Sequence, residues 1–504
     1  MRYRFGPLER RGLVAGWRGG QIATIGGGLV IAVVVLRADS SLAGVLVALL
    51  PVALTLAAAT WSVGGRTTEE WAPDAVRYVV SSGRRRYVRG NPFASLRLVS
   101  IDLVAPERTG AARAGSARAY TTGSYRSDVS GSSAPRSESR PDPGQAAVVV
   151  DSVCGTYTAV FAASGAGFVL LGEEDKAQRV GAWSGVLGSL AREGSSVHRI
   201  QWAQRSVPDD MTGLVDQIET AQALTGARAV GGNAAAYRSY AALVQAQAAS
   251  SRRHEVLLAV SVHEARAARV VRARGGGQAG ACSLVLREAA GLRRRLADAG
   301  IDAGNVLGPD ELSRTFRQAF EFRHGFREPA GPCPWPWPMG VHSEWGRVLV
   351  DGTWHATYWI SEWPRTEVGP DFLGPVLLAP EVRSAVSLVM EPLGPVQAAR
   401  KIEQTRTADI ADSELRRRGG FLATARRRRE QEVLVQREME LAEGHAPYRF
   451  SGYVTVSAVS PDELEDACAQ TEQSAARCGL ELRLCYGDQA RAFLATLPLG
   501  RGLA

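Results

Sequence analysis

Residues 19–36 read GGQIATIGGGLVIAVVVL, and residues 41–65 read SLAGVLVALLPVALTLAAATWSVGG. Neither stretch contains a charged side chain, and a short linker from Arg37 to Ser40 separates them. About 20 apolar residues are enough for a helix to cross a bilayer. The sequence therefore predicts a transmembrane hairpin with basic flanks over residues 1–66, followed by a large polar body.

A different interpretation of the same stretches is a helical hairpin buried in the core of a water-soluble protein. Residues 29–36 and 43–59 are apolar on every side of a helix rather than on one face, which favours lipid over a protein core. A removed signal peptide is excluded because no small-residue cleavage site follows the first stretch and a second stretch comes at once.

Arginines flank the hairpin on both sides and predict its orientation. The membrane-proximal basic residues are Arg10, Arg11, Arg18, Arg66, Arg84, Arg85, Arg86 and Arg89. Basic flanks stay on the cytoplasmic side of a membrane. We therefore expect a two-span protein of the plasma (inner) membrane, with its amino terminus and its carboxy-terminal body in the cytoplasm.

Net charge gives no sign of nucleic-acid binding. Residues 1–104 contain thirteen Arg and six acidic residues, a balance of +7, whereas the whole chain carries +8. Nearly all the excess lies beside the predicted membrane segments, where arginine is attracted to anionic headgroups. The rest of the chain is close to neutral, so direct binding to nucleic acid is not expected.

The polar body has an α+β pattern that we divide into two cytoplasmic α/β sandwich subdomains. The first covers residues 67–330 and contains a segment, about 105–145, whose Gly, Ser, Pro and Arg content predicts disorder. The Pro-rich run 331–338 marks the boundary. The second covers residues 331–504 and includes a long charged helix at about 396–443.

Strands are expected where apolar residues alternate or cluster, and helices where they recur at helical spacing. The expected strands are 97–103, 146–153, 157–163, 168–171, 197–204, 255–262, 347–350, 355–361, 382–391, 450–458 and 481–485. The expected helices are 176–193, capped by Asp175, then 233–250, 281–299, 309–319, 462–477 and 488–496. Residues 301–307 are expected to be a link, 372–378 a helix or a buried connection, and Asp351-Gly352 the turn of a hairpin.

Motifs for catalysis are absent from the sequence. There is no phosphate-binding loop, since neither Lys176 nor Lys401 follows a glycine. The chain also lacks a G-x-S-x-G elbow, an H-E-x-x-H pair and cysteines at zinc spacing. His263-Glu264 fits an acid–base pair, but it fits an ordinary strand end better. We expect no catalytic residue, no metal and no cofactor.

Two further groups of residues have both a structural and a functional interpretation. Six tryptophans between residues 335 and 363 could stack bases or sugars, although core and interface packing explains them more simply. The run Arg426, Arg427, Arg428 and Arg429 fits a solvated helix face, or else a possible contact with an acidic partner surface.

Short motifs along the body resemble a membrane-protein family of actinobacterial conjugative and secretion-like gene clusters. That family is similar to the amino-terminal, non-motor half of the VirB-family ATPase of type IV secretion, with a fused two-helix membrane anchor. The matching parts are the hairpin to Trp61, Arg84–Arg89 with Gly90-Asn91-Pro92-Phe93, His254–Val262, Leu292, Gly300-Ile301, Leu307, Glu311-Leu312, Val350-Asp351-Gly352, Trp363-Pro364, Ser460–Leu464, and Phe493 with Pro498-Leu499.

The resemblance implies a non-catalytic platform that docks a separate P-loop ATPase and other secretion subunits, as a homo-oligomer in contact with lipid. No catalytic residue carries over, because the family's motor half would follow residue 499. EccE, a component of the type VII secretion membrane complex, also resembles the chain in its two-span anchor and α/β body, and it stays open as the alternative. A membrane-tethered enzyme of unknown chemistry is the third possibility.

Overall fold

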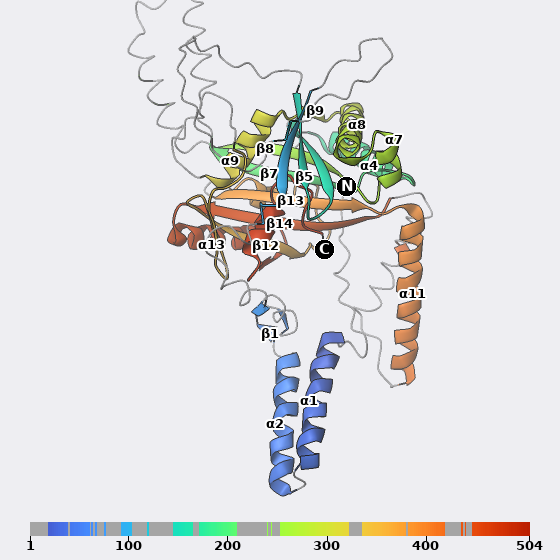
Figure 1. Ribbon diagram of the computed structural model, residues 1–504, viewed down its shortest axis with the longest axis vertical. Coiled ribbons are helices and arrows are strands. Elements are labelled where there is room, and N and C mark those ends of the chain that lie inside the picture. The colour runs from blue at the N-terminus through green and yellow to red at the C-terminus, as the bar shows by residue number, and fades with distance from the viewer. Residues whose placement is uncertain are drawn as a thin grey trace, which may run out of the picture.

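The body of the protein is a mixed α+β fold on one antiparallel sheet, as a computed structural model shows (Figure 1). The structure describes residues 19–38, 41–60, 62–63, 66–67, 75–76, 92–102, 118–119, 145–164, 171–208, 239, 243, 252–321, 335–379, 382–418, 435–436, 439 and 446–503. The predicted α+β class is thereby confirmed.

The main sheet has 13 strands in the order β10-β11-β12-β14-β13-β7-β8-β6-β5-β3-β4, with β15 beside β12 and β9 beside β6. The strands are β3 (Leu96–Asp102), β4 (Arg118–Ala119), β5 (Gln145–Asp151), β6 (Thr156–Ser164), β7 (Arg199–Pro208), β8 (Arg252–His263), β9 (Asp302–Val306), β10 (Val341–Ser343), β11 (Val348–Val350), β12 (Thr353–Glu362), β13 (Arg383–Pro392), β14 (Tyr448–Ala458) and β15 (Glu481–Leu484). A separate ribbon pairs β1 (Ser62–Val63) with β2 (Arg66–Thr67).

Most helices begin and end close to the predicted positions. They are α1 (Gly19–Ala38), α2 (Leu42–Thr60), α4 (Glu173–Leu190), α7 (Ala268–Ala273), α8 (Gly277–Asp298), α9 (Pro309–Phe320), α10 (Gly374–Leu377), α11 (Pro395–Arg418), α13 (Pro461–Arg477) and α14 (Gln489–Leu494). The predicted cap of α4 is wrong: Gly172 precedes the helix, and Asp175 lies in its first turn.

The two halves of the sheet repeat one order of elements. In the first half the hairpin β5–β6 precedes α4, β7, β8, α8, β9 and α9, and in the second β11–β12 precedes α10, β13, β14, α13, β15 and α14. The strand pairs also correspond. Strand β6 pairs with β5, β8 and β9, and strand β12 pairs with the equivalent strands β11, β14 and β15. The body is therefore an internal repeat.

An approximate two-fold axis relates the halves and passes between β7 and β13. These two strands are antiparallel neighbours, with Trp202 opposite Leu388. The ends of α8 and α13 have the same hydrogen bond. After α8, the N–H of Ile301 donates to the carbonyl of Leu296 over 2.9 Å, and after α13 the N–H of Leu480 donates to the carbonyl of Ala475 over 2.9 Å. Gly300 (φ 72°) and Gly479 (φ 70°) supply the left-handed residue that this cap requires.

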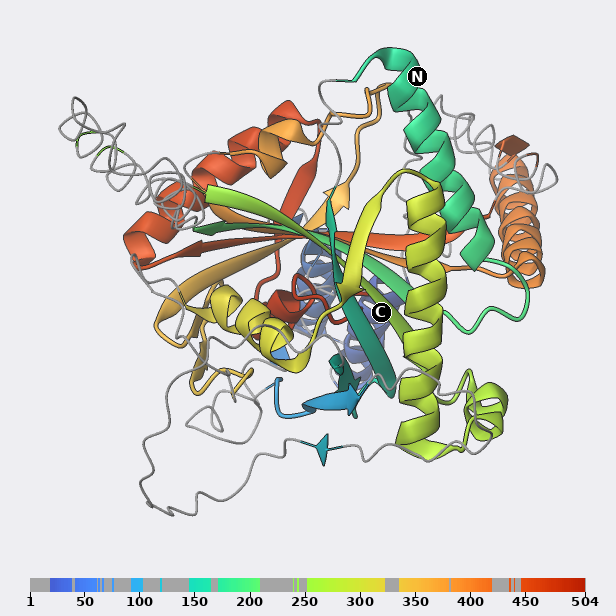
Figure 2. The ribbon, with the colours of Figure 1, turned by 90° about the horizontal axis from the view of Figure 1, so that it is seen from above.

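Helices cover both faces of the shared sheet (Figure 2). One face packs against α4 and α8 in the first half and against α10 and α13 in the second. The opposite face packs against α9, α14 and the segment that follows α14. Strand β7 belongs to the first predicted subdomain and β13 to the second, and the two strands are hydrogen-bonded neighbours. The sheet is therefore continuous between the two predicted subdomains, and their division at residue 330 stays a prediction.

The predicted apolar hairpin is present as α1 and α2, which lie side by side away from the sheet (Figure 1). Small residues form their contact: a Cβ on Gly28 would come within 2.1 Å of Thr55 Oγ1, and Ala32 and Ala48 are buried. Among the described residues, no helix combines the length and the apolar character of a membrane span. The predicted two-span topology thus gains no support from that criterion.

Two predictions about local structure are corrected. Residues 302–306, expected as a link, form β9, because their backbone pairs with the end of β6. The segment at about 105–145 was expected to be wholly disordered, yet Arg118–Ala119 pairs with β3 as β4. Residues 168–170 of the expected strand, most of the helix 233–250 and most of the helical region beyond residue 418 lie outside the described residues.

Candidate functional site

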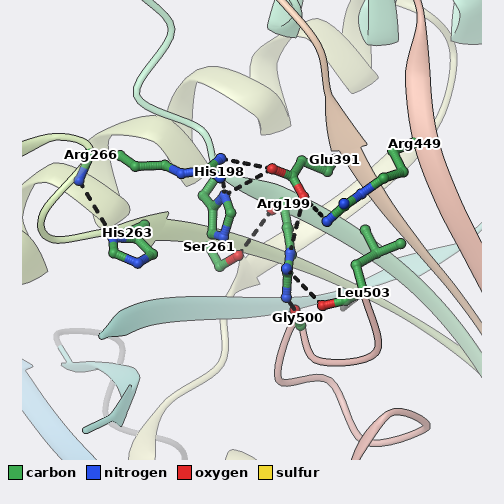
Figure 3. Close-up of polar contacts among 9 residues, drawn as sticks. All are labelled: His198, Arg199, Ser261, His263, Arg266, Glu391, Arg449, Gly500 and Leu503. Atoms are coloured by element: carbon green, nitrogen blue, oxygen red, sulfur yellow. Dashed lines mark hydrogen bonds and ion pairs between the residues drawn. The ribbon is translucent and has the colours of Figure 1, made fainter. Parts of the chain in front are cut away.

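The most concentrated group of charges lies at one end of the β7–β13 junction, around the carboxylate of Glu391 (Figure 3). Arg266 Nη1 donates to Glu391 Oε1 over 2.7 Å, and Arg449 Nη2 donates to Oε2 over 2.9 Å. Arg199 Nε lies 3.7 Å from Oε2. The Glu391 side chain is only 7% exposed, so its charge depends on these three guanidinium groups. We call Arg199, Arg266, Glu391 and Arg449 the arginine–glutamate cluster.

The order of strands brings these residues together from distant parts of the chain. Glu391 is opposite Arg449 in the β13–β14 pair. Its neighbour Met390 is opposite Ile200, which places the start of β7 and Arg199 beside the carboxylate. Arg266 lies in the turn after β8, which borders β7 on its other side. The cluster therefore joins the two halves of the repeat.

His198 completes the cluster in its neutral form. Burial, followed by the charges of Arg199 and Arg266, lowers the pKa of His198 to about 4. Its Nδ1 lies 3.2 Å from Arg266 Nη1. Because a guanidinium is only a donor, the neutral ring accepts this hydrogen bond through Nδ1 and carries its proton on Nε2. The edge of the His263 ring lies against His198, with 5.3 Å between centroids.

The cluster carries an excess of positive charge. Burial opposes ionisation of Glu391, but the hydrogen bond from Arg266 and the charges of Arg449 and Arg266 outweigh it and lower the pKa of the carboxyl group. Burial also lowers the pKa of Arg199, and Glu391 counteracts that effect. At neutral pH three guanidinium groups thus face one carboxylate and a neutral imidazole.

Arg199 also binds the chain segment that follows α14. Its Nη1 donates to the carbonyl of Gly500 over 3.2 Å and its Nη2 to that of Leu503 over 2.9 Å. The completely buried Gln201 is a second anchor. Its Nε2 lies 2.9 Å from the carbonyl of Ala495 and 2.8 Å from that of Leu497, and its Oε1 accepts from the N–H of Gly500 over 2.7 Å.

This segment, residues 495–503, connects both halves of the sheet. Tyr453 on β14 donates to the carbonyl of Gly502. Arg501 donates to Asp151 over 2.6 Å and to Ser95 over 2.9 Å in the first half. The nearby Cys154 is not an activated nucleophile, because burial and the Asp151 charge raise the pKa of its thiol. The segment acts as a strap across the junction.

The geometry of the cluster fits a structural clamp rather than catalysis. A base that is held by several guanidinium groups is a poor proton acceptor, because its charged form is strongly stabilised. At the other end of the junction, a cavity of about 30 Å³ lies between Arg205, Thr315 and Arg383. That volume suits a water molecule, not a substrate. Within the described ranges, no three His, Cys, Asp or Glu side chains converge as metal ligands would.

The residues singled out in the sequence contribute little to this site. Arg66 lies in β2, whereas the other membrane-proximal arginines and Arg426 to Arg429 lie outside the described residues. His263 ends β8, as the preferred strand-end interpretation expects, and Glu264 accepts from the Tyr157 hydroxyl over 3.2 Å. The arginine–glutamate cluster was missed, because its members are not related by any regular spacing in the sequence.

The tryptophan-rich stretch mainly packs within the body. Trp337 lies against Phe316, with 5.0 Å between ring centroids, and Trp345 stacks on Tyr486 at 6.1 Å. Trp359 donates to Ser451 over 3.0 Å. These contacts agree with the structural interpretation of the tryptophans.

Comparison with known families finds a similarity in the centre of the chain. Residues 250–360 match the family EccE, described as "Putative type VII ESX secretion system translocon". The matched segment runs from β8 into β12. Comparison with curated proteins gave no match.

The match discriminates between the secretion alternatives that the sequence left open. It supports a component of a type VII secretion membrane complex better than the type IV interpretation. The predicted resemblance to half of a VirB-family ATPase, and with it a role in conjugation, gains no support.

Proposed function

We propose that the protein is a non-catalytic, membrane-anchored component of a type VII secretion membrane complex. The observation that carries this proposal is the match of residues 250–360 to EccE. The matched segment includes Arg266 of the arginine–glutamate cluster and strands of both halves. It therefore contains part of each half, although β7 and β13, which pair across the junction, lie outside it.

The packing of α1 and α2 supports a lipid environment for the hairpin. Its contact is made by Gly28, Ala32, Gly44 and Ala48, which are buried. Its large apolar residues point outward: Val30 is 64% exposed and Leu46 is 64% exposed. Small residues between helices and large apolar residues outside are typical of membrane proteins, because lipid rather than water surrounds the pair. A hairpin in water would bury the large side chains.

The orientation follows from the hairpin shape. Both open ends of α1 and α2 point toward the sheet (Figure 1), so both would lie on the same side of the bilayer. The basic flanks favour the cytoplasm for that side. We therefore propose that the amino terminus and the body are cytoplasmic.

The body would act through its surface. The carboxylate of the arginine–glutamate cluster is already neutralised, and the sequence has no phosphate-binding loop. We propose that a separate P-loop ATPase and other secretion subunits dock on this body and that several copies assemble. Purified protein should show no ATPase activity, and hydrolysis that a point mutation in this chain removes would contradict that proposal.

Affinity purification from the native membrane, with mass spectrometry of the partners, tests the proposal. We expect other type VII secretion subunits to co-purify, including a P-loop ATPase. Recovery of conjugation subunits alone, or of no secretion subunit, would refute the assignment.

A matched pair of variants tests the anchor. The double variant Leu46→Asp, Leu50→Asp puts two charges on outward positions of α2, each costing about 3 kcal/mol in lipid. We expect it to become extractable with alkaline carbonate. The control Phe450→Asp changes an exposed apolar residue of the body, 42% exposed, and should stay membrane-bound. Equal extraction of the unaltered chain would remove the anchor from the proposal.

A further inference from the structure

Helix α11 leaves the sheet on the same side as the hairpin. It begins at Pro395, directly after β13, and extends past the body in the direction of α1 and α2 (Figure 1). Its 24 residues give it a length of about 36 Å. Its far end reaches the level at which the hairpin begins (Figure 1), and Figure 2 shows it well to one side of the hairpin.

The internal repeat makes this position specific to the second half. Residues 393–447 connect β13 to β14, and residues 209–251 make the equivalent connection from β7 to β8. Because β7 and β13 are antiparallel, these two connections leave opposite ends of the sheet. The connection that contains α11 leaves the end of the sheet at which β13 ends, and α11 then runs in the direction of the hairpin (Figure 1).

Charge along α11 is distributed unevenly. Residues 395–415 contain three basic and four acidic residues, whereas Arg416, Arg417 and Arg418 end the helix. One basic residue at a helix end is explained by the helix dipole. These three arginines occupy successive positions of the last described turn of the helix. Farther back, Ile410 is 61% exposed.

We propose that the end of α11 rests on anionic lipid headgroups and holds the body at a second point beside the hairpin. The inference rests on the proposed membrane anchoring. Phosphate groups at an anionic surface attract a cluster of arginines, and the attraction falls off within a Debye length, about 10 Å. The end of α11 can meet that surface because it lies at the level at which the hairpin begins (Figure 1).

Fluorescence quenching by spin-labelled headgroups tests the contact in the full chain. The chain is reconstituted in phosphatidylcholine vesicles with or without phosphatidylglycerol. An environment-sensitive dye is attached at Ile410→Cys or, as the control on the same helix, at Val396→Cys, and the signal of the labelled unaltered chain is subtracted. Val396 is 46% exposed and lies about 21 Å nearer the sheet.

We expect quenching at position 410 to exceed that at position 396 at least two-fold, and to require phosphatidylglycerol. The triple variant Arg416→Gln, Arg417→Gln, Arg418→Gln should reduce quenching at position 410 to the level of position 396. Equal quenching at both positions, or quenching that ignores phosphatidylglycerol and the triple variant, would overturn the proposal. Contact between dyes at position 410 would also overturn the proposal, because it would mean that the end of α11 contacts a second copy of the chain.

Failure of the anchor itself gives a different result. If α1 and α2 do not enter lipid, carbonate releases the chain from the vesicles before any quenching is measured. Retention in carbonate without selective quenching at position 410 refutes only the role of α11.

Discussion

Replacement of Glu391 by Gln tests whether the arginine–glutamate cluster holds the two halves together. The substitution keeps the shape of the side chain and removes its charge. Breaking a buried ion pair from one side costs about 3–5 kcal/mol, because the remaining charge is left without compensation. Here Arg266 is 63% exposed and Arg449 is 41% exposed, so both guanidinium groups can turn toward water. Arg199 is 13% exposed and cannot.

The expected loss is therefore near the lower limit, about 3 kcal/mol of the free energy of unfolding. For a chain of this size, 1 kcal/mol corresponds to about 1–2 °C in Tm, so Tm should fall by about 4 °C. Tryptophan fluorescence of the full chain in detergent, at a fixed heating rate, measures the shift. Glu465→Gln is the control, because Glu465 is 79% exposed and lies 3.8 Å from Arg347 in a surface pair worth less than about 1 kcal/mol.

A double-mutant cycle identifies the residue responsible. If the unpaired charge of Arg199 causes the loss, then Arg199→Gln should cost less in the Glu391→Gln background than in the unaltered chain, by about 1–2 kcal/mol. Strictly additive losses would refute the reasoning, and so would a Tm for Glu391→Gln equal to that of Glu465→Gln.

Three further predictions concern other parts of the fold. Burial holds the folded pKa of His198, about 4, below its unfolded value, so the folded state loses stability as pH falls from about 6.5 toward 4. His198→Asn should remove up to about 3 kcal/mol from the pH dependence of the free energy of unfolding over that window, as thermal unfolding at several pH values would measure. Gly452→Ala should lower the free energy of unfolding by about 1–3 kcal/mol in a thermal unfolding assay, since the added Cβ would lie 2.7 Å from Ile360 Cδ1. Gly291→Ala in α8, where nothing lies within 4 Å of the added Cβ, should raise the free energy of unfolding slightly in the same assay. Gln201→Leu should cost about 3 kcal/mol and speed hydrogen exchange in residues 495–503.

The controls for these predictions are internal. For His198, a pH dependence identical in the variant and the unaltered chain would exclude the histidine as its source. For Gly452, stability that does not fall below that of Gly291→Ala would mean that the sheet yields to the added methyl group. For Gln201, unchanged exchange in residues 495–503 would show that the strap is held by its other contacts.

Local structure could be predicted where local rules decide it. The turn Asp351-Gly352 was identified because both residues tolerate the positive φ angles of 45° and 88° that this hairpin has. Helix α9 was identified from Pro309 in its first turn and the acidic residues that follow. Strand β9 was missed because DAGNV has no strand pattern of its own and is extended only by pairing with β6.

Long-range structure could not be predicted for a different reason. Both β7 and β13 are largely buried, so their sequences do not indicate which strands are their neighbours in the sheet. The arginine–glutamate cluster depends on that choice, because Arg199 and Glu391 are adjacent only when β7 pairs with β13. Nothing in the local sequence around Glu391 distinguishes it from an exposed residue at a strand end.

The symmetry of the body has a practical consequence for anyone who works with pieces of the gene. The family match begins within the first repeat and stops within the second, so its limits do not coincide with those of a folding unit. A fragment cut at those limits would contain β8 without its partner β7 and β12 without its partner β14. Expression of the matched stretch alone should give insoluble product, whereas a cut made between α9 and β10 would leave each repeat with its own strands and one newly exposed edge.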